Sequence, residues 1–336
     1  MEMKKNYLVF VMSLLIILFH INSKANSTEL PGMRSIPLNL PDISVVGNFY
    51  SEISKESKNI LNISEVEIAL QGYVYPNLYS NVIFSHHRDE FELEEAYLSF
   101  SNVFKGLSLE AGKRLLEFGK INKIHPHHRP YFDQPEVITS YLGEHGLSGV
   151  GYKIGYILPL NFFCQLMLAA YDIPQHLHSH FSEENYEHSF SPKDKGYFSK
   201  IWLSFPLSGV SELETGLNYL ASKGPHFNEH KDEIELLGLD ITYKYEFSTY
   251  RKLKLQTEII QLSRNIPLGA YYRLGGYFYS GFTLSKYYSI GLRFDYLEKP
   301  EIHSEENFDE KESISLYSFI ITRNLTETSF LRLQYK

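Results

Sequence analysis

The chain has 336 residues, a net charge of −8 and a single cysteine, Cys164. The mild negative charge gives no reason to expect a nucleic-acid partner, and a single cysteine excludes an intramolecular disulfide. Tyr (26) and Phe (23) are abundant beside one Trp. Because strand-forming residues dominate between the loops, the sequence predicts an all-β protein.

The N-terminus has the pattern of a secretion signal. Lys4 and Lys5 precede an apolar run from Tyr7 to Phe19, and a small-x-small cleavage site follows at Ser23–Ala25. The apolar run is too short to span a membrane comfortably, which favours a cleaved signal peptide over an uncleaved anchor. The sequence therefore divides into a signal peptide (1–25), a periplasmic segment (26–42) and a folded domain (43–336).

Apolar and polar residues alternate in short segments from Ile43 to the C-terminus, as in half-buried β-strands. Leu237 and Leu239, for example, alternate with Gly238 and Asp240. Each segment is about as long as a tilted strand that crosses a bilayer. The fifteen candidate strands are 43–50, 65–75, 78–86, 92–102, 107–114, 148–158, 162–171, 197–205, 212–221, 233–247, 252–263, 270–285, 288–298, 312–323 and 329–335.

Alternation alone does not separate a soluble sandwich from a membrane barrel, because the apolar face can meet either a core or lipid. Two further features favour the barrel. Tyrosines recur at the ends of the apolar faces, as interfacial girdles require: Tyr75, Tyr152, Tyr156, Tyr243, Tyr245, Tyr288 and Tyr296. Tight turns such as Pro76-Asn77 also alternate with mostly longer loops such as 115–147. Outer-membrane barrels show this asymmetry between periplasmic turns and extracellular loops.

We therefore predict an antiparallel transmembrane β-barrel in the bacterial outer membrane. Its partners would be outer-membrane lipid and lipopolysaccharide, and the outer-membrane insertion machinery. Fifteen strands is an odd count, whereas single-chain bacterial barrels close with an even number. We expect a barrel of the sixteen-stranded type that is truncated by about one C-terminal strand and folds poorly, since an open edge in lipid is costly. The alternative, that 43–50 is not a barrel strand, would turn the long loops toward the periplasm.

Several segments resemble known outer-membrane barrels. Glu94–Phe100, Gly106–Arg114 and Phe118-Gly119 resemble the E-A-Y-L…L-x-x-G-x…F-G block of phosphate-selective (O/P-type) porins. Pro41–Gly47, Gly143–Leu147 and the His-rich loops look closer to barrels often labelled zinc-regulated TonB-dependent outer-membrane receptors. The resemblance implies a sixteen-stranded channel.

The chain departs from both patterns. Only about sixteen residues separate the predicted cleavage site from the first strand, which leaves no room for the plug domain of a TonB-dependent receptor. The predicted lumen face mixes both signs of charge, without the basic constriction that phosphate selectivity needs. The predicted pore-lining residues are Glu67, Glu95, Glu110, Arg114, Lys200, Asp240, Glu258, Arg273, Arg293, Asp295 and Arg332.

Histidine placement is the clearest chemical signal. Eleven of the fourteen histidines fall in the longer loops, and none falls on a strand at membrane depth. Two clusters have metal-ligand chemistry, because imidazole suits Zn, Cu and Ni. These candidate ligands are His125, His127, His128, His176, His178 and His180. No cofactor is required for the predicted function, and Zn²⁺ at the outer loops is an option. The alternative is that the first cluster packs against Arg129-Pro130-Tyr131 inside the barrel mouth.

The 115–147 loop is long enough to fold back and narrow the lumen. Lys123, Arg129, Asp133 and Glu136 would then set the charge of the constriction. The alternative is a loop that lies on the outer surface.

The function that these features favour is a porin-like channel for small hydrophilic solutes, with a link to uptake of zinc or another transition metal as an option. A homotrimer is compatible with such a barrel. The alternative is a surface binding or adhesion barrel that does not transport. A hydrolase is less favoured, because no histidine on a membrane-depth strand could serve as the base of a nucleophile. We do not expect an enzyme.

Overall fold

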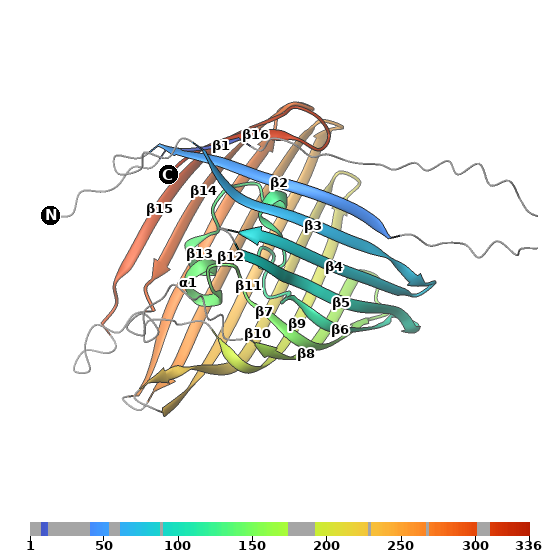
Figure 1. Cartoon of the computed structure of the whole chain (residues 1–336), viewed down its shortest axis with the longest axis vertical. Coiled ribbons are helices and arrows are strands. Elements are labelled where there is room, and N and C mark those ends of the chain that lie inside the picture. Colours follow the sequence, from blue (N-terminus) through green and yellow to red (C-terminus); the bar gives the residue numbers. More distant parts are fainter. Residues whose placement is uncertain are drawn as a thin grey trace, which may run out of the picture.

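The computed structural model describes residues 8–12, 41–53, 61–87, 90–173, 192–227, 230–266, 269–300 and 310–336. In this part of the chain, sixteen antiparallel strands form a closed barrel (Figure 1). Each of the strands β2 to β16 pairs with its neighbour in sequence, and β1 lies between β2 and β16. The first eight strands are Leu8–Met12 (β1), Asp42–Ile53 (β2), Asn62–Tyr75 (β3), Leu78–His87 (β4), Glu90–Phe104 (β5), Leu107–Leu115 (β6), Ser148–Ile157 (β7) and Phe163–Ile173 (β8).

The remaining strands are Lys193–Ser208 (β9), Ser211–Phe227 (β10), His230–Ser248 (β11), Arg251–Ile266 (β12), Gly269–Thr283 (β13), Tyr288–Glu298 (β14), Ser313–Asn324 (β15) and Phe330–Tyr335 (β16). A 3₁₀ turn, Pro126–His128 (η1), and a short helix, Glu136–Leu142 (α1), lie in the connection between β6 and β7. None of the described helices is long and apolar enough to cross a membrane.

The fifteen predicted strands are confirmed as β2 to β16, and β14 has its predicted bounds. The largest differences lie at the end of the barrel opposite the tight turns, which we call the loop end. There β10 extends to Phe227 and β11 starts at His230, so the predicted loop 222–232 is mostly a hairpin. His226 and His230, predicted to lie in a loop, are strand residues that pair with Lys231 and Phe227. The prediction was wrong because residues on both faces of this hairpin are polar, which removes the alternation that marks a strand.

Closure of the sheet uses a segment that the sequence assigns to a signal peptide. Leu8 to Met12 pair with Ile53 to Phe49 of β2 on one side and with Tyr335 to Leu331 of β16 on the other. The predicted barrel has an open edge here, whereas in the structure β1 pairs with both β2 and β16. Cleavage after residue 25 stays a prediction, and the predicted periplasmic segment lies outside the described residues up to residue 40.

The outward face of the barrel is apolar. Leu168, at the middle of β8, is 63% exposed, and Ile154 and Tyr152 of β7 are exposed beside it. At the turn end, Tyr75 and Tyr250 are exposed. A soluble protein would lose stability by exposing such a surface, whereas a bilayer covers it. The structure is therefore a transmembrane β-barrel, as predicted.

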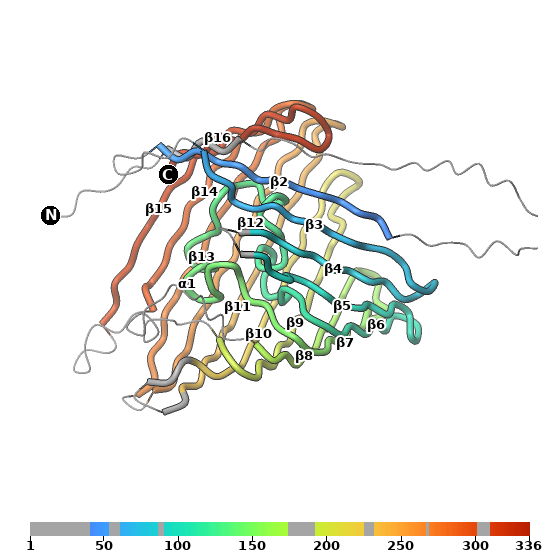
Figure 2. Tube along the Cα trace, viewed as in Figure 1, coloured from blue at the N-terminus to red at the C-terminus, as the bar shows by residue number. Residues whose placement is uncertain are grey.

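The connection between β6 and β7, residues 116–147, lies inside the barrel, and we call it the inward loop. Figures 1 and 2 show this green segment, with α1, inside the ring of strands. Its buried apolar side chains join a core with inward-facing side chains such as Leu220, Leu236 and Ile260. Of the two placements that the sequence left open, the structure has the inward one. The lumen face is consequently partly apolar where it contacts the loop, and not polar throughout as predicted.

The outward face gives a first test. Leu168→Lys would place a charge on the outward face at mid-strand, where lipid contact makes it cost about 2–4 kcal/mol. We expect the free energy of unfolding in urea, measured in lipid vesicles, to fall by this amount, with a much smaller loss for the control Leu168→Ala. Equal effects of the two substitutions would contradict a lipid-facing position.

The role of β1 gives a second test. Without residues 1–25, β2 and β16 lose their shared partner, and each unpaired backbone group in lipid costs several kcal/mol. We expect refolded 26–336 to lose its heat-modifiable gel mobility at a lower temperature than the refolded full chain. The same transition temperature for both would show that β1 adds nothing to the barrel.

Candidate functional site

The inward loop is closed at its base by a buried asparagine. Leu116 N–H donates to Leu147 O at 2.9 Å, which ties the two ends of the loop together. Asn122 is fully buried between them, and its amide donates to Leu116 O at 2.7 Å and to Leu147 O at 3.0 Å. Its Oδ1 accepts the Leu147 N–H at 2.8 Å. One side chain therefore binds the Leu116 carbonyl and the Leu147 amide as well as the Leu147 carbonyl, and so fixes the base of the loop.

The helix α1 fixes the second half of the loop. It starts after Pro135 with Glu136 in its first turn, where a carboxylate suits the helix dipole, and it ends at Gly143. Val137 and Tyr141 are fully buried against β13 and β14. A Cβ on Gly275 would lie 2.7 Å from Val137 Cγ2, so glycine at this position permits the close approach.

Charged side chains of the barrel wall bind the loop backbone at Gly119–Ile121. Lys200 Nζ donates to Gly119 O at 2.6 Å, and Asn218 Oδ1 accepts the Gly119 N–H at 3.1 Å. Glu258 Oε1 accepts the Ile121 N–H at 2.9 Å and the Tyr277 hydroxyl at 2.6 Å. Gly119 has φ of +66°, and a Cβ there would lie 1.9 Å from Glu258 Oε2. Glycine is therefore required at this contact for both conformation and space.

A second anchor holds Asp133. Arg293 Nη2 lies 3.0 Å from Asp133 Oδ1, and Lys336 Nζ lies 2.8 Å from Oδ2. Burial alone would raise the pKa of Asp133, but Arg293 and Lys336 hold this pKa below its ordinary value. Arg293 also donates to Asp295 Oδ2 at 2.7 Å and stacks on Tyr131 at 4.5 Å. The loop thus supplies a counter-charge for a guanidinium that would otherwise be buried with one carboxylate.

The third anchor is an acidic cluster around His125. The Nδ1 atom of His125 lies 3.1 Å from Glu67 Oε2 and 3.0 Å from Glu94 Oε2, and Nε2 lies 3.8 Å from Glu95 Oε2. Glu65, Glu67, Glu94 and His125 each offer one donor atom within 4.8 Å of the others. Burial alone would lower the pKa of His125, but the carboxylates raise it to about 12. The cluster can hold an imidazolium or a metal ion.

The structure describes three of the predicted metal ligands, His125, His127 and His128. Of these three, His125 alone belongs to the four-residue cluster. His127 Nδ1 lies 3.6 Å from Glu67 Oε2, and its burial lowers its pKa to about 4. The His128 ring packs on that of His127 at 4.1 Å and is exposed. The second predicted cluster, His176, His178 and His180, lies outside the described residues.

Two ligand candidates, Glu65 and Glu94, were missed by the sequence analysis. Glu65 and Glu67 are two apart on one strand, so the period of two places them on the same face. Glu94 and Glu95 are adjacent and would face opposite sides of a regular strand. A β-bulge changes this, since Ile83 pairs with Glu95 and Phe84 with Leu93. Glu94 is the extra residue, and no sequence pattern indicated the bulge.

All predicted pore-lining residues lie on the inward face. Glu110 is half-buried and the others are buried. Several contact the loop or each other: Lys200 lies 3.3 Å from Asp240, and Lys153 bridges Glu110 and Glu117. Arg273 donates to the carbonyls of Lys299 and Glu310. Their lining of a pore stays a prediction, because in this conformation they bind protein groups.

Of the predicted constriction residues, Lys123 lies 3.5 Å from Glu117 Oε2 and 5.3 Å from the Trp202 ring. Arg129 is buried and donates to Ile124 O at 2.8 Å. Glu136 forms an ion pair with Lys336. These residues therefore hold the loop to itself and to the wall.

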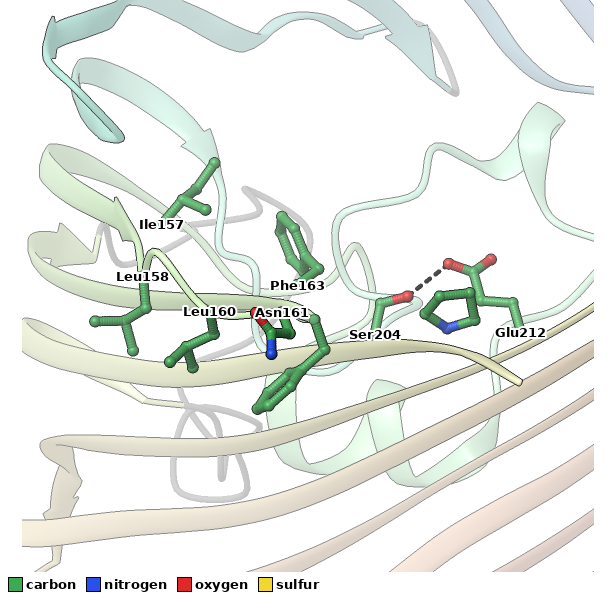
Figure 3. A pocket seen from close by; sticks show the side chains of 9 residues that line it. Ile157, Leu158, Leu160, Asn161, Phe163, Ser204 and Glu212 are labelled. Atoms are coloured by element: carbon green, nitrogen blue, oxygen red, sulfur yellow. Dashed lines mark hydrogen bonds between the residues drawn. The ribbon is translucent and has the colours of Figure 1, made fainter. Parts of the chain in front are cut away.

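A shallow pocket of about 480 Å³ lies at the turn end, beside the 158–162 connection (Figure 3). Its lining includes Leu160, Phe163 and Ser204, and Ser204 Oγ donates to Glu212 Oε1 at 2.6 Å. The nine lining residues include no histidine. The pocket therefore lacks the imidazole base of a serine hydrolase.

Comparison with known proteins adds no function. No family model matches the chain. An uncharacterized protein from Aquifex aeolicus is 26% identical over 314 residues, which cover 86% of this chain. The chain spans 65% of the length of that relative.

Similar solved structures include a loop-deletion mutant of OmpT, an outer membrane protein of Vibrio cholerae, at 10% identity and a TM-score of 0.49, covering 98% of this chain and 96% of that one. The outer membrane channel DcaP of Acinetobacter baumannii is 11% identical at a TM-score of 0.43, covering 91% of this chain and 99% of that one. OprB of Pseudomonas putida is 10% identical at a TM-score of 0.38, covering 98% and 92%. Identities this low carry no information on solute or mechanism.

The docking of the loop is testable with trypsin, because the loop contains cleavable bonds after Lys120 and Lys123. Glu258→Ala would leave the Ile121 N–H and the Tyr277 hydroxyl without their acceptor, at about 1–3 kcal/mol for each buried group. We expect the refolded variant to be cleaved within the loop while wild type and Leu168→Ala are protected, as measured by mass spectrometry of the fragments. Equal protection of Glu258→Ala would contradict this anchor.

Proposed function

We propose that the protein is a porin-like channel of the bacterial outer membrane for small hydrophilic solutes, and that the inward loop controls its lumen. The observation that carries this proposal is the wall of buried charged residues that binds the loop through side chains. Charged groups within a membrane-spanning structure are expensive and commonly mark solute or ion pathways. In this barrel, charged side chains face inward from at least seven strands. One from each is Glu67, Arg114, Lys200, Asp240, Glu258, Arg293 and Arg332.

The mode of docking supports a loop that can be released. The loop is held by hydrogen bonds, ion pairs and apolar contacts, and the single cysteine, Cys164, excludes a disulfide to the wall. Withdrawal of the loop would expose Lys200, Asp240 and Glu258 together on one part of the wall. These charges are of both signs. The opened lumen would therefore suit small hydrophilic solutes in general and would not select anions.

The buried interior favours a second candidate function. Asp240, Arg273 and Glu258 are at most 1% exposed, so the described lumen has no water-filled path along them. A barrel whose loop stays docked would bind ligands at its surface without transport. Both proposed functions include the same partners. These are outer-membrane lipid and lipopolysaccharide, the insertion machinery and, in a homotrimer, two further copies of the chain. Uptake of zinc or another transition metal is an extension of the channel proposal.

Planar-bilayer recording separates the two functions. We expect the refolded wild type to show small or brief ohmic steps, and Glu258→Ala to show larger or longer ones, because it weakens the loop anchor. Leu168→Ala, on the outward face, should conduct as wild type does. If neither wild type nor Glu258→Ala shows steps above background, the channel is excluded and the non-transporting barrel is favoured.

A further inference from the structure

We propose that Glu65, Glu67, Glu94 and His125 bind one first-row divalent transition-metal cation, which pins the inward loop to the barrel wall. The four residues come from three segments: Glu65 and Glu67 from β3, Glu94 from β5 and His125 from the loop. An ion held by all four would therefore be a crosslink between the loop and two strands.

The spacing of His125 to two of its carboxylate neighbours fits a metal centre. Zinc bonds to histidine nitrogen and carboxylate oxygen measure about 2.0–2.2 Å, so neighbouring donors in one coordination shell lie about 3–3.6 Å apart. His125 Nδ1 lies 3.1 Å from Glu67 Oε2 and 3.0 Å from Glu94 Oε2. Within the described residues, neither ring nitrogen of His125 has hydrogen-bond geometry to these carboxylates. The distances are short but the directions are not those of N–H···O bonds, as expected for donors that face a common centre.

The local backbone is built to bring these donors together. His125 is only 8% exposed, so the imidazole is enclosed and directed into the carboxylates. A bulge in β5 makes Glu94 the extra residue between the Leu93 and Glu95 pairs. A second bulge lies in β3, where Asn48 pairs with Glu65 and Phe49 with Ile63. Bulges re-aim side chains and often lie next to functional sites, and here two flank one cluster.

The charge of the cluster favours a divalent ion over a single proton. Three carboxylates, with Glu95 close by, surround one imidazole, which supplies at most one positive charge. Arg129 adds a second positive charge, which interacts electrostatically with Glu65 and Glu94. A divalent cation would supply two charges at the centre of the cluster, where the Coulomb energy is largest.

The donor set selects the class of metal. Carboxylate oxygens suit Mg²⁺, Ca²⁺ and Mn²⁺, whereas imidazole suits Zn²⁺, Cu²⁺, Fe²⁺ and Ni²⁺. Three oxygens with one nitrogen match Mn²⁺, Fe²⁺ or Zn²⁺. Mg²⁺ dehydrates reluctantly and is not expected to replace its waters with an imidazole.

A crosslink between loop and wall would oppose undocking of the loop, and this consequence rests on the proposed channel function. Binding of the metal lowers the free energy of the docked state relative to the released state, because the released state separates His125 from the three glutamates. The metal would therefore close the channel.

The test is calorimetric titration of the refolded full chain with Zn²⁺, with Mg²⁺ as comparison. His176, His178 and His180 are first replaced by Ala, so that the second predicted cluster adds no binding. We expect one Zn²⁺ site in this background, with affinity reduced at least about tenfold by Glu94→Gln or His125→Asn, and no comparable Mg²⁺ binding. His128→Asn is the matched control, since His128 is an exposed histidine of the same turn, and it should bind as the background does.

Heat-modifiable gel mobility confirms that each variant is folded, and the near-isosteric Glu94→Gln keeps the test valid where His125→Asn fails to fold. The proposal is overturned if the background binds no Zn²⁺, which would leave His125 as an imidazolium ion pair, or if both variants bind Zn²⁺ as tightly as His128→Asn does.

Conductance with and without Zn²⁺ separates this inference from the proposed function. We expect Zn²⁺ to reduce conductance in the background but not in His125→Asn. Zn²⁺ binding without conductance in any variant would reject the channel and keep the metal site. Conductance without Zn²⁺ binding would reject the metal site and keep the channel.

Discussion

The structure depends on one constraint: charges inside a membrane-spanning barrel must be neutralised by protein groups where the inward loop displaces water. The loop meets this constraint with both kinds of backbone group, because Lys200 binds the Gly119 carbonyl and Glu258 binds the Ile121 amide. A wall of mixed sign is therefore what a docked polypeptide requires, since a peptide backbone presents donors and acceptors side by side. In an open pore, a wall with charges of both signs indicates weak selectivity for ions. In this structure the same wall is complementary to the backbone of the loop.

The period-two pattern predicted the strands wherever one face meets lipid. The strand β14 has its predicted bounds because Ile290, Leu292 and Phe294 alternate with small or charged residues over most of its length. The pattern fails toward the loop end of β10 and β11, where Lys223 and Glu233 pair and neither face needs to be apolar. Outside the lipid, backbone pairing with the neighbouring strand determines where a strand ends. The hydropathy of a single segment does not reveal this pairing.

For a related reason, the sequence predicted only some of the residues of the candidate metal site. The predicted clustering of histidine in loops pointed to His125, although His226 and His230 are strand residues. The partners of His125 depend on which strands the loop tip reaches and on a bulge that turns Glu94 inward. Likewise, Leu236 and Ile260 face the interior at positions that a purely polar lumen excludes. Their burial follows from the fold of the inward loop, which the sequence left undecided between two placements. Local patterns predict elements, whereas contacts between distant segments require the assembled barrel.

The loop is not held uniformly. Its base is closed by Asn122, and α1 is buried among apolar side chains of β13 and β14, whose stabilisation does not depend on charge. Residues 123–130 are different, because most are half-buried or exposed, and His125 and Arg129 are the buried exceptions. These two side chains are cationic or metal-binding groups that face carboxylates, so electrostatics decide whether this stretch stays docked. Ion chemistry therefore acts on the part of the loop that hydrophobic burial secures least, while the base and α1 keep the rest in place. In the proposed channel, release of the loop would therefore begin at its tip and would not require the barrel to unfold.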